Sequence, residues 1–296
     1  MSFSASNAFL PPTKGESDRP KMQAIASSRN TAHPFPFIFL QFLLLVLQAL
    51  APAGAHRSPS SYASSALTEW RSAHASYYAT FEPRDTVGGA CGYGDLGKSG
   101  YGMATAGLSE ALFAKGEACG GCYEVRCVEE LRYCLPGTSI VVTATNFCAP
   151  NYGLPSDAGG ICNRPNNHFL MPIEAFEKIA IWKAGVMPIQ YRRVKCVRQG
   201  GIRFTMEGRG FFINVLISNV AGAGDVTAVK VKGTMIGGWL PMARSWGQNW
   251  HISADLKGQA LSFELTNSDG VTLTSYNVAQ KDWEFGRTYI GKQFPF

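Results

Sequence analysis

Cysteine is absent from the final part of this 296-residue chain, because all eight cysteines lie between Cys91 and Cys196. A second Cys-x-x-Cys beside the pair Cys119 and Cys122 is also missing, and the five histidines are scattered, so the ligand spacing of a structural zinc site is not present. A redox pair is disfavoured, since a β-rich run follows Cys122 and no βαβ unit does. The even count indicates disulfides, whose connectivity the spacing leaves open among 105 pairings. No metal or organic cofactor is implied.

Charge is scarce as well. Charged residues make up 16% of the chain, and 27 Lys and Arg against 21 Asp and Glu give a formal charge of +6. No basic cluster interleaves with aromatic residues, so a nucleic-acid partner is not expected, whereas weak attraction to an acidic polymer or surface is. The sequence has no Asn-x-Ser/Thr site, and N-glycosylation is therefore not expected. Hydrophobic residues reach 46%, enough for the core of one large or two modest domains.

Only one long apolar run exists, at residues 37–50, and it is shorter than a membrane span. Small residues at 53–55 follow it as an Ala-x-Ala cleavage site, and Lys21 and Arg29 supply a positive region before it. Residues 1–55 are therefore interpreted as a secretory leader, with Met22 as a second candidate start and a retained signal anchor as the alternative. We expect secretion, with membrane association only during export and no stable insertion after cleavage.

The first part of the chain reads as a spacer over residues 56–73 and a mostly β domain over residues 74–198. Alternating and β-branched runs predict its strands. Residues 172–180 predict the best helix, because their apolar side chains share one face. Residues 105–115 fit either a short helix or a strand and loop. The expected strands are 74–81, 123–127, 139–145 and 188–197, with a long loop over 146–167.

A short polar joint at residues 199–203 leads to a second domain over residues 204–296. Short β-rich runs alternate there with turns of Gly, Asp and Asn, a pattern typical of an all-β sandwich. The spacing fits roughly seven or eight strands, none of which carries a cysteine. No internal repeat is present.

Several long motifs resemble the plant α-expansins, in the order of that family and from about Tyr77 to Phe296. The motifs are Thr80, Gly88-Gly-Ala-Cys-Gly-Tyr-Gly94, Cys119-Gly-Gly-Cys-Tyr-Glu-Val-Arg-Cys127, Thr143-Ala-Thr-Asn-Phe-Cys148, His168-Phe169, Trp239-Leu-Pro-Met242 and Trp246-Gly-Gln-Asn-Trp250. The resemblance implies a six-stranded double-psi β-barrel, similar to that of inverting endoglucanases, followed by an immunoglobulin-like β-sandwich that binds cellulose. It also implies the disulfides Cys91–Cys119, Cys122–Cys196, Cys127–Cys134 and Cys148–Cys162.

The function that the resemblance implies is loosening of the plant cell wall at acid pH without hydrolysis. Such a protein disturbs noncovalent contacts between cellulose and matrix glucans such as xyloglucan. It would be secreted to the cell wall, or apoplast, and act as a monomer.

Hydrolysis requires two carboxyl groups on either side of the scissile bond. Related barrels place one acid at the end of a His-Phe-Asp motif, where this chain has Leu170, and a second acid where it has Asn146. Each missing acid or base lowers the rate by about 10²–10⁴-fold. No catalytic residue is therefore expected. Residues 81–83 (Phe-Glu-Pro) also depart from the family and alter the groove floor.

Two other functions stay open. A weak endoglucanase could use Asp95 or Asp157 as a surrogate acid, although both fit turn residues that cap local backbone. A carbohydrate-binding structural wall protein, whose loosening activity was lost with Leu170, is the third reading.

Five residues are candidates for a polysaccharide-binding groove in the first domain: Thr80, Tyr93, Asp95, Asn146 and His168. For Thr80 and Tyr93 the rival role is a buried structural hydroxyl, and for His168 a hydrogen-bonded barrel histidine.

Trp239, Trp246 and Trp250 are the candidate cellulose-binding aromatics of the second domain, within a set that includes Trp283 and Tyr289. Each ring that stacks on a glucose face would contribute about 1–2 kcal/mol. Core packing is the rival role, since sandwiches bury a Trp or two. We expect Trp239 at the surface, one of Trp246 and Trp250 in the core, and Trp283 in a structural role.

Overall fold

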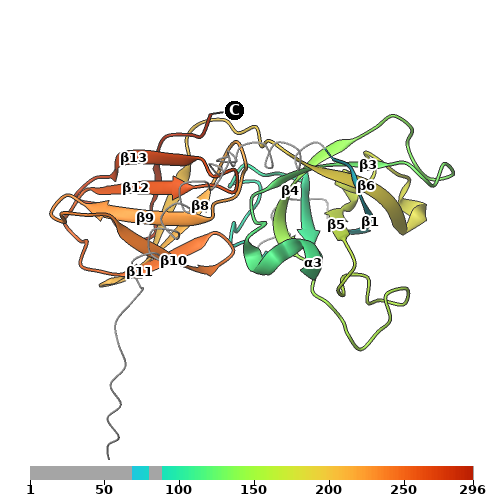
Figure 1. Ribbon diagram of the computed structural model, residues 1–296, viewed down its shortest axis with the longest axis horizontal. Helices are drawn as coiled ribbons and strands as arrows, with labels where there is room; N and C mark the ends of the chain where they lie inside the picture. Colours follow the sequence, from blue (N-terminus) through green and yellow to red (C-terminus); the bar gives the residue numbers. More distant parts are fainter. Residues whose placement is uncertain (1–68, 80–88, 296) are drawn as a thin grey trace, which may run out of the picture. The chain divides into compact units, whose positions relative to one another are not determined.

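The computed structural model describes residues 69–79 and 89–295. The expected leader, most of the expected spacer, Thr80 and the departure at residues 81–83 lie outside the described residues. Strands dominate the rest of the chain, as the sequence predicts (Figure 1). Every helix in the described part is too short or too little apolar to cross a lipid bilayer.

Six strands close into a barrel in the order β1-β5-β2-β4-β3-β6. The pairs β1–β5 and β2–β4 are parallel, and the other four are antiparallel. This confirms the predicted six-stranded barrel. The strands are β1 (Arg71–Tyr78), β2 (Thr105–Leu108), β3 (Cys122–Cys127), β4 (Ile140–Phe147), β5 (His168–Pro172) and β6 (Val186–Val194).

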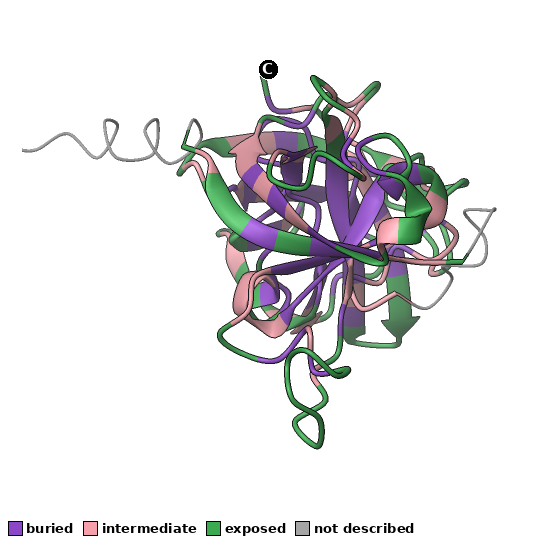
Figure 2. Ribbon diagram, turned by 90° about the vertical axis from the view of Figure 1, so that its right-hand side faces the viewer, coloured by how far each residue is buried: buried purple, intermediate pink, exposed green. Residues whose placement is uncertain are grey.

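Strand β1 begins at Arg71, three residues earlier than its alternation suggested, because Arg71 pairs with Tyr191 of β6. Its inward positions are small: Ala73 and Ala75 are buried. These small side chains leave space inside the barrel. Larger buried side chains on the neighbouring strands, such as Phe169, fill that space. Buried residues gather on the central strands in Figure 2, whereas the long loops and parts of the outer strands are exposed.

The predicted nine-residue helix at 172–180 is wrong in length. Only α4 (Ile173–Phe176) is helical, and turns continue to Ala180. The chain beyond it is diverted because the N–H of Leu135 donates to the carbonyl of Ile179, and the N–H of Ile181 donates to that of Tyr133. The undecided segment 105–115 contains both alternatives, β2 and then α3 (Glu110–Phe113). Two 3₁₀ turns complete the barrel domain, η2 (Ala114–Gly116) and η3 (Trp182–Ala184).

All four disulfides have the pairing that the resemblance implied, and no cysteine is free. Cys148–Cys162 closes part of the long loop between β4 and β5. Cys122–Cys196 spans 74 positions and ties the start of β3 to the end of the barrel domain.

Eight strands form the second domain, in the order β13-β12-β9-β10-β11-β8-β7-β14. Strand β10 joins two layers, because its first half pairs with β9 and its second half with β11. Phe204 of one layer stacks on Phe263 of the other, with 4.6 Å between ring centroids. The predicted β-sandwich is thereby confirmed. The strands are β7 (Arg203–Arg209), β8 (Phe212–Ser218), β9 (Ala228–Gly233), β10 (Leu240–Trp246), β11 (Asn249–Ser253), β12 (Leu261–Thr266), β13 (Thr272–Ala279) and β14 (Thr288–Ile290).

A polar seam joins the barrel to the sandwich. The Arg193 guanidinium of β6 lies 2.9 Å from the Asp225 carboxylate of the loop between β8 and β9, and both side chains are largely buried. Cys196 and Gly222 exchange two backbone hydrogen bonds. The Gln248 amide donates to the carbonyl of Cys119 at 3.0 Å. These contacts come from two separate segments of the sandwich, the loop between β8 and β9 and the turn between β10 and β11, so the seam is a packed junction.

The disulfide loops predict an order of stabilities. Cys122 and Cys196 are separated by 74 positions and Cys127 and Cys134 by 7. Loop-closure entropy assigns about 4 kcal/mol to the first bridge and about 2 kcal/mol to the second. We expect both double variants to have a lower free energy of unfolding than wild type, measured by denaturant titration. The decrease should be about twice as large for Cys122→Ala/Cys196→Ala as for Cys127→Ala/Cys134→Ala. Equal losses would contradict the entropic assignment.

Candidate functional site: groove floor and aromatic face

The floor of the candidate groove lies where three barrel strands meet. Gly107 of β2 pairs with Leu170 of β5 on one side and with Asn146 of β4 on the other. Paired residues on adjacent strands direct their side chains to the same face, so Leu170 and Asn146 flank a position that has no side chain. Two strand spacings place their Cα atoms about 10 Å apart. We call these three residues the groove floor.

Asn146 is held in place by backbone. Its side-chain oxygen accepts the N–H of Ala90 and the N–H of Phe147, both at 2.8 Å. Leu170 is half-buried and aliphatic. Neither side chain of the floor carries a group that titrates between acid and neutral pH.

Asp95 is a turn residue, as its alternative role suggested. Its carboxylate accepts the N–H groups of Lys98 and Gly97 at 3.1 and 2.9 Å. These hydrogen bonds hold the pKa of Asp95 below its ordinary value, and the one from Lys98 has the largest effect. Asp157 lines a different cleft, of 320 Å³, together with His74 and His168. The two aspartates thus lie in separate clefts, and neither belongs to the floor.

His168 is 1% exposed, and its Nε2 is hydrogen-bonded to the hydroxyl of Ser76 at 2.7 Å. Its backbone N–H donates to the hydroxyl of Ser109. Burial, with a smaller contribution from His74, lowers the pKa of His168 to about 4. A histidine so enclosed does not present its ring to a polymer, and the structural role describes it.

Tyr93 is also almost wholly buried, with its ring centroid 4.5 Å from that of Tyr101. Burial raises the pKa of Tyr93 well above its ordinary value. Of the four candidate groove residues that the structure describes, Asn146 alone lies on the floor. Asp95 and Tyr93 lie instead along a cleft of 560 Å³ where the loop 89–95 meets strands β7, β8 and β14.

An aromatic face covers the outer side of the layer β10-β11-β8-β7-β14. Trp246 pairs with Asn249, which pairs with Leu216. Trp246 is 52% exposed, and Phe212, four residues before Leu216 on β8, is 48% exposed. Two strand spacings and four residues place Trp246 and Phe212 about 17 Å apart. We call this surface, with the exposed Phe211 beside it, the aromatic face.

Polar groups lie between the rings of the aromatic face. His251 lies against Phe212, with 5.7 Å between ring centroids. Asn214 donates to the side-chain oxygen of Asn249 at 3.0 Å, and Asn249 has a buried side-chain N–H group with no partner. Phe211 and Phe212 were not candidates in the sequence analysis. The signal available was an aromatic pair directly after the turn at Gly210, where one of two successive residues must face outward.

The three candidate tryptophans have three different environments. Trp250 is 4% exposed and belongs to the sandwich core, with the guanidinium of Arg244 4.4 Å from its ring centroid. The expectation that Trp250 contacts cellulose is therefore wrong, because its inward position on β11 encloses both ring faces. Trp246 is the exposed member of the pair. Trp239 lies beside Tyr276, with 6.3 Å between ring centroids, on the other layer. Trp283 is buried, as its structural role requires.

The loop 89–95 connects the groove floor to the aromatic face. Its N-terminal end is bonded to Asn146 through Ala90. Farther along, a Cβ added to Gly92 would lie 2.3 Å from the side-chain nitrogen of Asn249 and 3.0 Å from the ring of Trp246. Gly92 also has φ +83°, which favours glycine. Because Gly92 has no side chain, the loop can pack closely against Trp246.

Burial of His168 predicts a pH dependence of stability. Its pKa is about 4 in the folded protein and 6.5 unfolded, so the unfolded state binds more protons between these values. The contribution of His168 to the free energy of unfolding is therefore complete above pH 6.5. It decreases as the pH falls to 4, by about 3 kcal/mol at most. His168→Gln should lose less unfolding free energy over this range, measured by denaturant titration at several pH values. The same pH dependence in both proteins would contradict the assignment.

Two family models match this chain. The model described as the expansin C-terminal domain matches residues 202–279, which contain most of the sandwich. The model described as lytic transglycolase matches residues 105–191, which contain most of the barrel.

Solved structures of a bacterial protein have the same fold. Apo Clavibacter michiganensis expansin matches with a TM-score of 0.59 and 16% identity, over 77% of this chain and 100% of that one. A mutant of that protein, in complex with cellohexaose, matches with a TM-score of 0.58. At this identity the match supports the fold alone.

Plant relatives are much closer in sequence. Expansin-A10 of Oryza sativa subsp. japonica is 71% identical over 253 residues, which cover 85% of this chain and 98% of the relative. Expansin-A13 of Arabidopsis thaliana is 64% identical over 257 residues, which cover 85% and 96%. With both domains matched, the chain belongs to the plant α-expansins and is a cell-wall-loosening protein.

Proposed function

We propose that this expansin loosens the wall at acid pH without cutting glycosidic bonds, by disturbing noncovalent contacts between cellulose and matrix glucans such as xyloglucan. The observation that supports the proposal is the groove floor, where Leu170 and Asn146 flank Gly107. Inverting hydrolysis needs a proton donor on one side of the bond and a base on the other. An alkyl group and an amide supply neither.

The surrogate acid of the alternative endoglucanase is not favoured. A general acid must be protonated near the working pH, which in hydrolases requires a raised carboxyl pKa. Hydrogen bonds from the backbone of Lys98 and Gly97 move the pKa of Asp95 in the opposite direction. Asp157 lies in a cleft without a second carboxylate among its lining residues.

Polysaccharide binding fits the aromatic face. Trp246 and Phe212 expose rings about 17 Å apart, diagonally across strands β10, β11 and β8, and the imidazole of His251 and the amides of Asn214 and Asn249 lie between them. Each ring contributes about 1–2 kcal/mol, comparable with one or two net hydrogen bonds. Contacts of this strength exchange with glucan–glucan contacts and do not lock the protein to one place. The complex of the bacterial relative with cellohexaose supports the same ligand class for this chain.

The proposal includes secretion to the apoplast and a monomeric state. Four disulfides and no free cysteine suit an oxidising compartment. The apolar run and the small residues after it, at 37–55, supply the export signal.

Creep of heat-inactivated cell wall under constant load tests the proposal. We expect the wild-type protein to extend the wall at acid pH, less at neutral pH, and to release no reducing ends in the same bath. Leu170→Asp should also release none, because a single carboxyl beside Asn146 lacks its partner base. Leu170→Ile is the matched control for the substitution itself. New reducing ends from wild type would contradict the proposal, and creep from Leu170→Asp alone would identify wild type as a binding protein.

Cellulose binding by the aromatic face is tested by truncating its rings. We expect Trp246→Ala and Phe212→Ala each to weaken binding to microcrystalline cellulose by about 5–30-fold, the equivalent of 1–2 kcal/mol. Trp182→Ala is a matched control, because Trp182 is 48% exposed on the barrel and belongs to neither surface. Depletion isotherms give the affinities. Unchanged binding in both ring variants would remove this face as the cellulose site.

A further inference from the structure

We propose that the sandwich has a second glucan-binding surface, formed by Trp239 and Tyr276 on the layer opposite the aromatic face, and that its occupant is a neutral β-1,4-linked glucan chain. We call this surface the second face. The inference rests on the proposed function in one respect, that the aromatic face is the one that holds cellulose.

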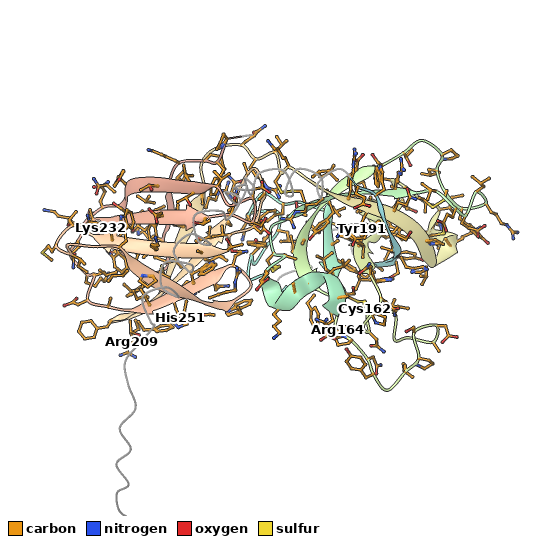
Figure 3. All side chains as sticks on the ribbon, viewed as in Figure 1. Cys162, Arg164, Tyr191, Arg209, Lys232 and His251 are labelled. Carbon is orange, nitrogen blue, oxygen red and sulfur yellow. A yellow bond between two sulfur atoms is a disulfide. The ribbon has the colours of Figure 1, made fainter. Side chains whose placement is uncertain are left out.

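The two surfaces lie on opposite sides of the sandwich core. Trp246 is on the half of β10 that pairs with β11, whereas Trp239 directly precedes the half that pairs with β9. Between the layers lie buried side chains such as Phe204 and Phe263. Lys232, labelled in Figure 3, belongs to the layer of the second face, and His251 to that of the aromatic face.

Trp239, directly before β10, and Tyr276 of β13 lie at opposite edges of one layer and still meet. Trp239 precedes Leu240, which pairs with Val231 of β9, and Tyr276 follows Ser275, which pairs with Phe263 of β12. Strands β9 and β12 thus lie between them, yet their ring centroids are 6.3 Å apart. The two side chains must therefore lean toward each other across the surface of the sheet.

Both rings are available to a ligand. Tyr276 is 68% exposed and Trp239 is half-buried, and neither belongs to the core cluster or to the residues packed against it. A Cβ added to Gly237 or Gly238, just before Trp239, would meet no atom within 4 Å. The two residues before Trp239 therefore have open space beside them. Exposed rings gathered at one place are typical of surfaces that bind the apolar faces of sugars.

The charges and hydroxyl groups of this layer favour a neutral occupant. Lys230 and Glu264, on β9 and β12, form an ion pair at 2.8 Å, so their charges offset each other. The hydroxyl groups of Thr266 and Thr272 are hydrogen-bonded to each other, with 2.9 Å between their oxygens. A hydroxyl-rich, uncharged chain finds rings and hydroxyl groups here, whereas an acidic polymer finds Lys232 of β9, beside the paired Lys230, and no larger basic cluster among the described residues of this layer.

Two faces would make the sandwich bivalent. While the aromatic face holds cellulose, the second face would hold another glucan chain. Because the two faces are separated by the thickness of one domain, the second face stays at a high local concentration near chains beside the bound cellulose. A protein placed between two chains in this way is positioned to compete with their direct contacts.

Capture of a second chain by protein already on cellulose tests the inference. The full protein is bound to microcrystalline cellulose at saturation, washed, and titrated with fluorescent cellohexaose. We expect Trp239→Ala/Tyr276→Ala to keep its binding to cellulose but to capture the oligosaccharide at least 5-fold more weakly than wild type. Val271→Ala, on the same sandwich and 44% exposed, is the control. Thermal unfolding verifies that each variant is folded.

A second arm separates the inference from the proposed function. Trp246→Ala/Phe212→Ala protein is titrated with cellohexaose in solution, with and without the further change Trp239→Ala. Residual binding that the third change weakens supports the second face, even where wild type shows no creep. Equal capture by wild type and Trp239→Ala/Tyr276→Ala would overturn the inference. Retention of polygalacturonate in place of cellohexaose would overturn the neutral occupant.

Discussion

The ion pair between Arg193 and Asp225 is the constraint on which the arrangement of the site depends. Burial alone would lower the pKa of Arg193, but Tyr123 and Asp225 raise it overall, so the guanidinium stays charged inside the seam. Removing one partner would leave the other charge buried and unpaired at a cost of about 3–5 kcal/mol, so the pair fixes which residues of the two domains meet at the seam. The barrel and the sandwich therefore present their surfaces together, and the loop 89–95 joins the groove floor to Trp246.

The proposed function assigns the aromatic face to holding glucans, and the groove floor has no pair of carboxyl groups that would cut them. The floor replaces both expected carboxylates with Asn146 and Leu170, and Asn146 is used to fix the loop at Ala90. In the proposed function, the binding energy comes from aromatic rings of modest strength, distributed over two layers of the sandwich. Weak contacts at several points suit a protein that must exchange places with the polymers it separates.

Much of this fold follows from the sequence. The disulfide framework follows from eight cysteines after an expected export signal, and their pairing follows from the family resemblance. Strand patterns gave the two β domains. The helix at 172–180 was overestimated because long-range pairing of Leu135 with Ile179 overrides a local pattern. The tryptophans could not be assigned from spacing, because β10 changes layers between Trp239 and Trp246. Sequence periodicity shows which residues share a face and does not show which layer that face belongs to.

The most direct test of non-hydrolytic loosening is creep measured in water labelled with heavy oxygen. Any glycosidic bond cut by water would place one labelled oxygen on the sugar at the break. We predict that the wild-type protein extends the wall at acid pH and that mass spectrometry of the digested wall finds no label above a protein-free control. Label that increases in proportion to extension would contradict the account, because it would mean that extension proceeds by hydrolysis.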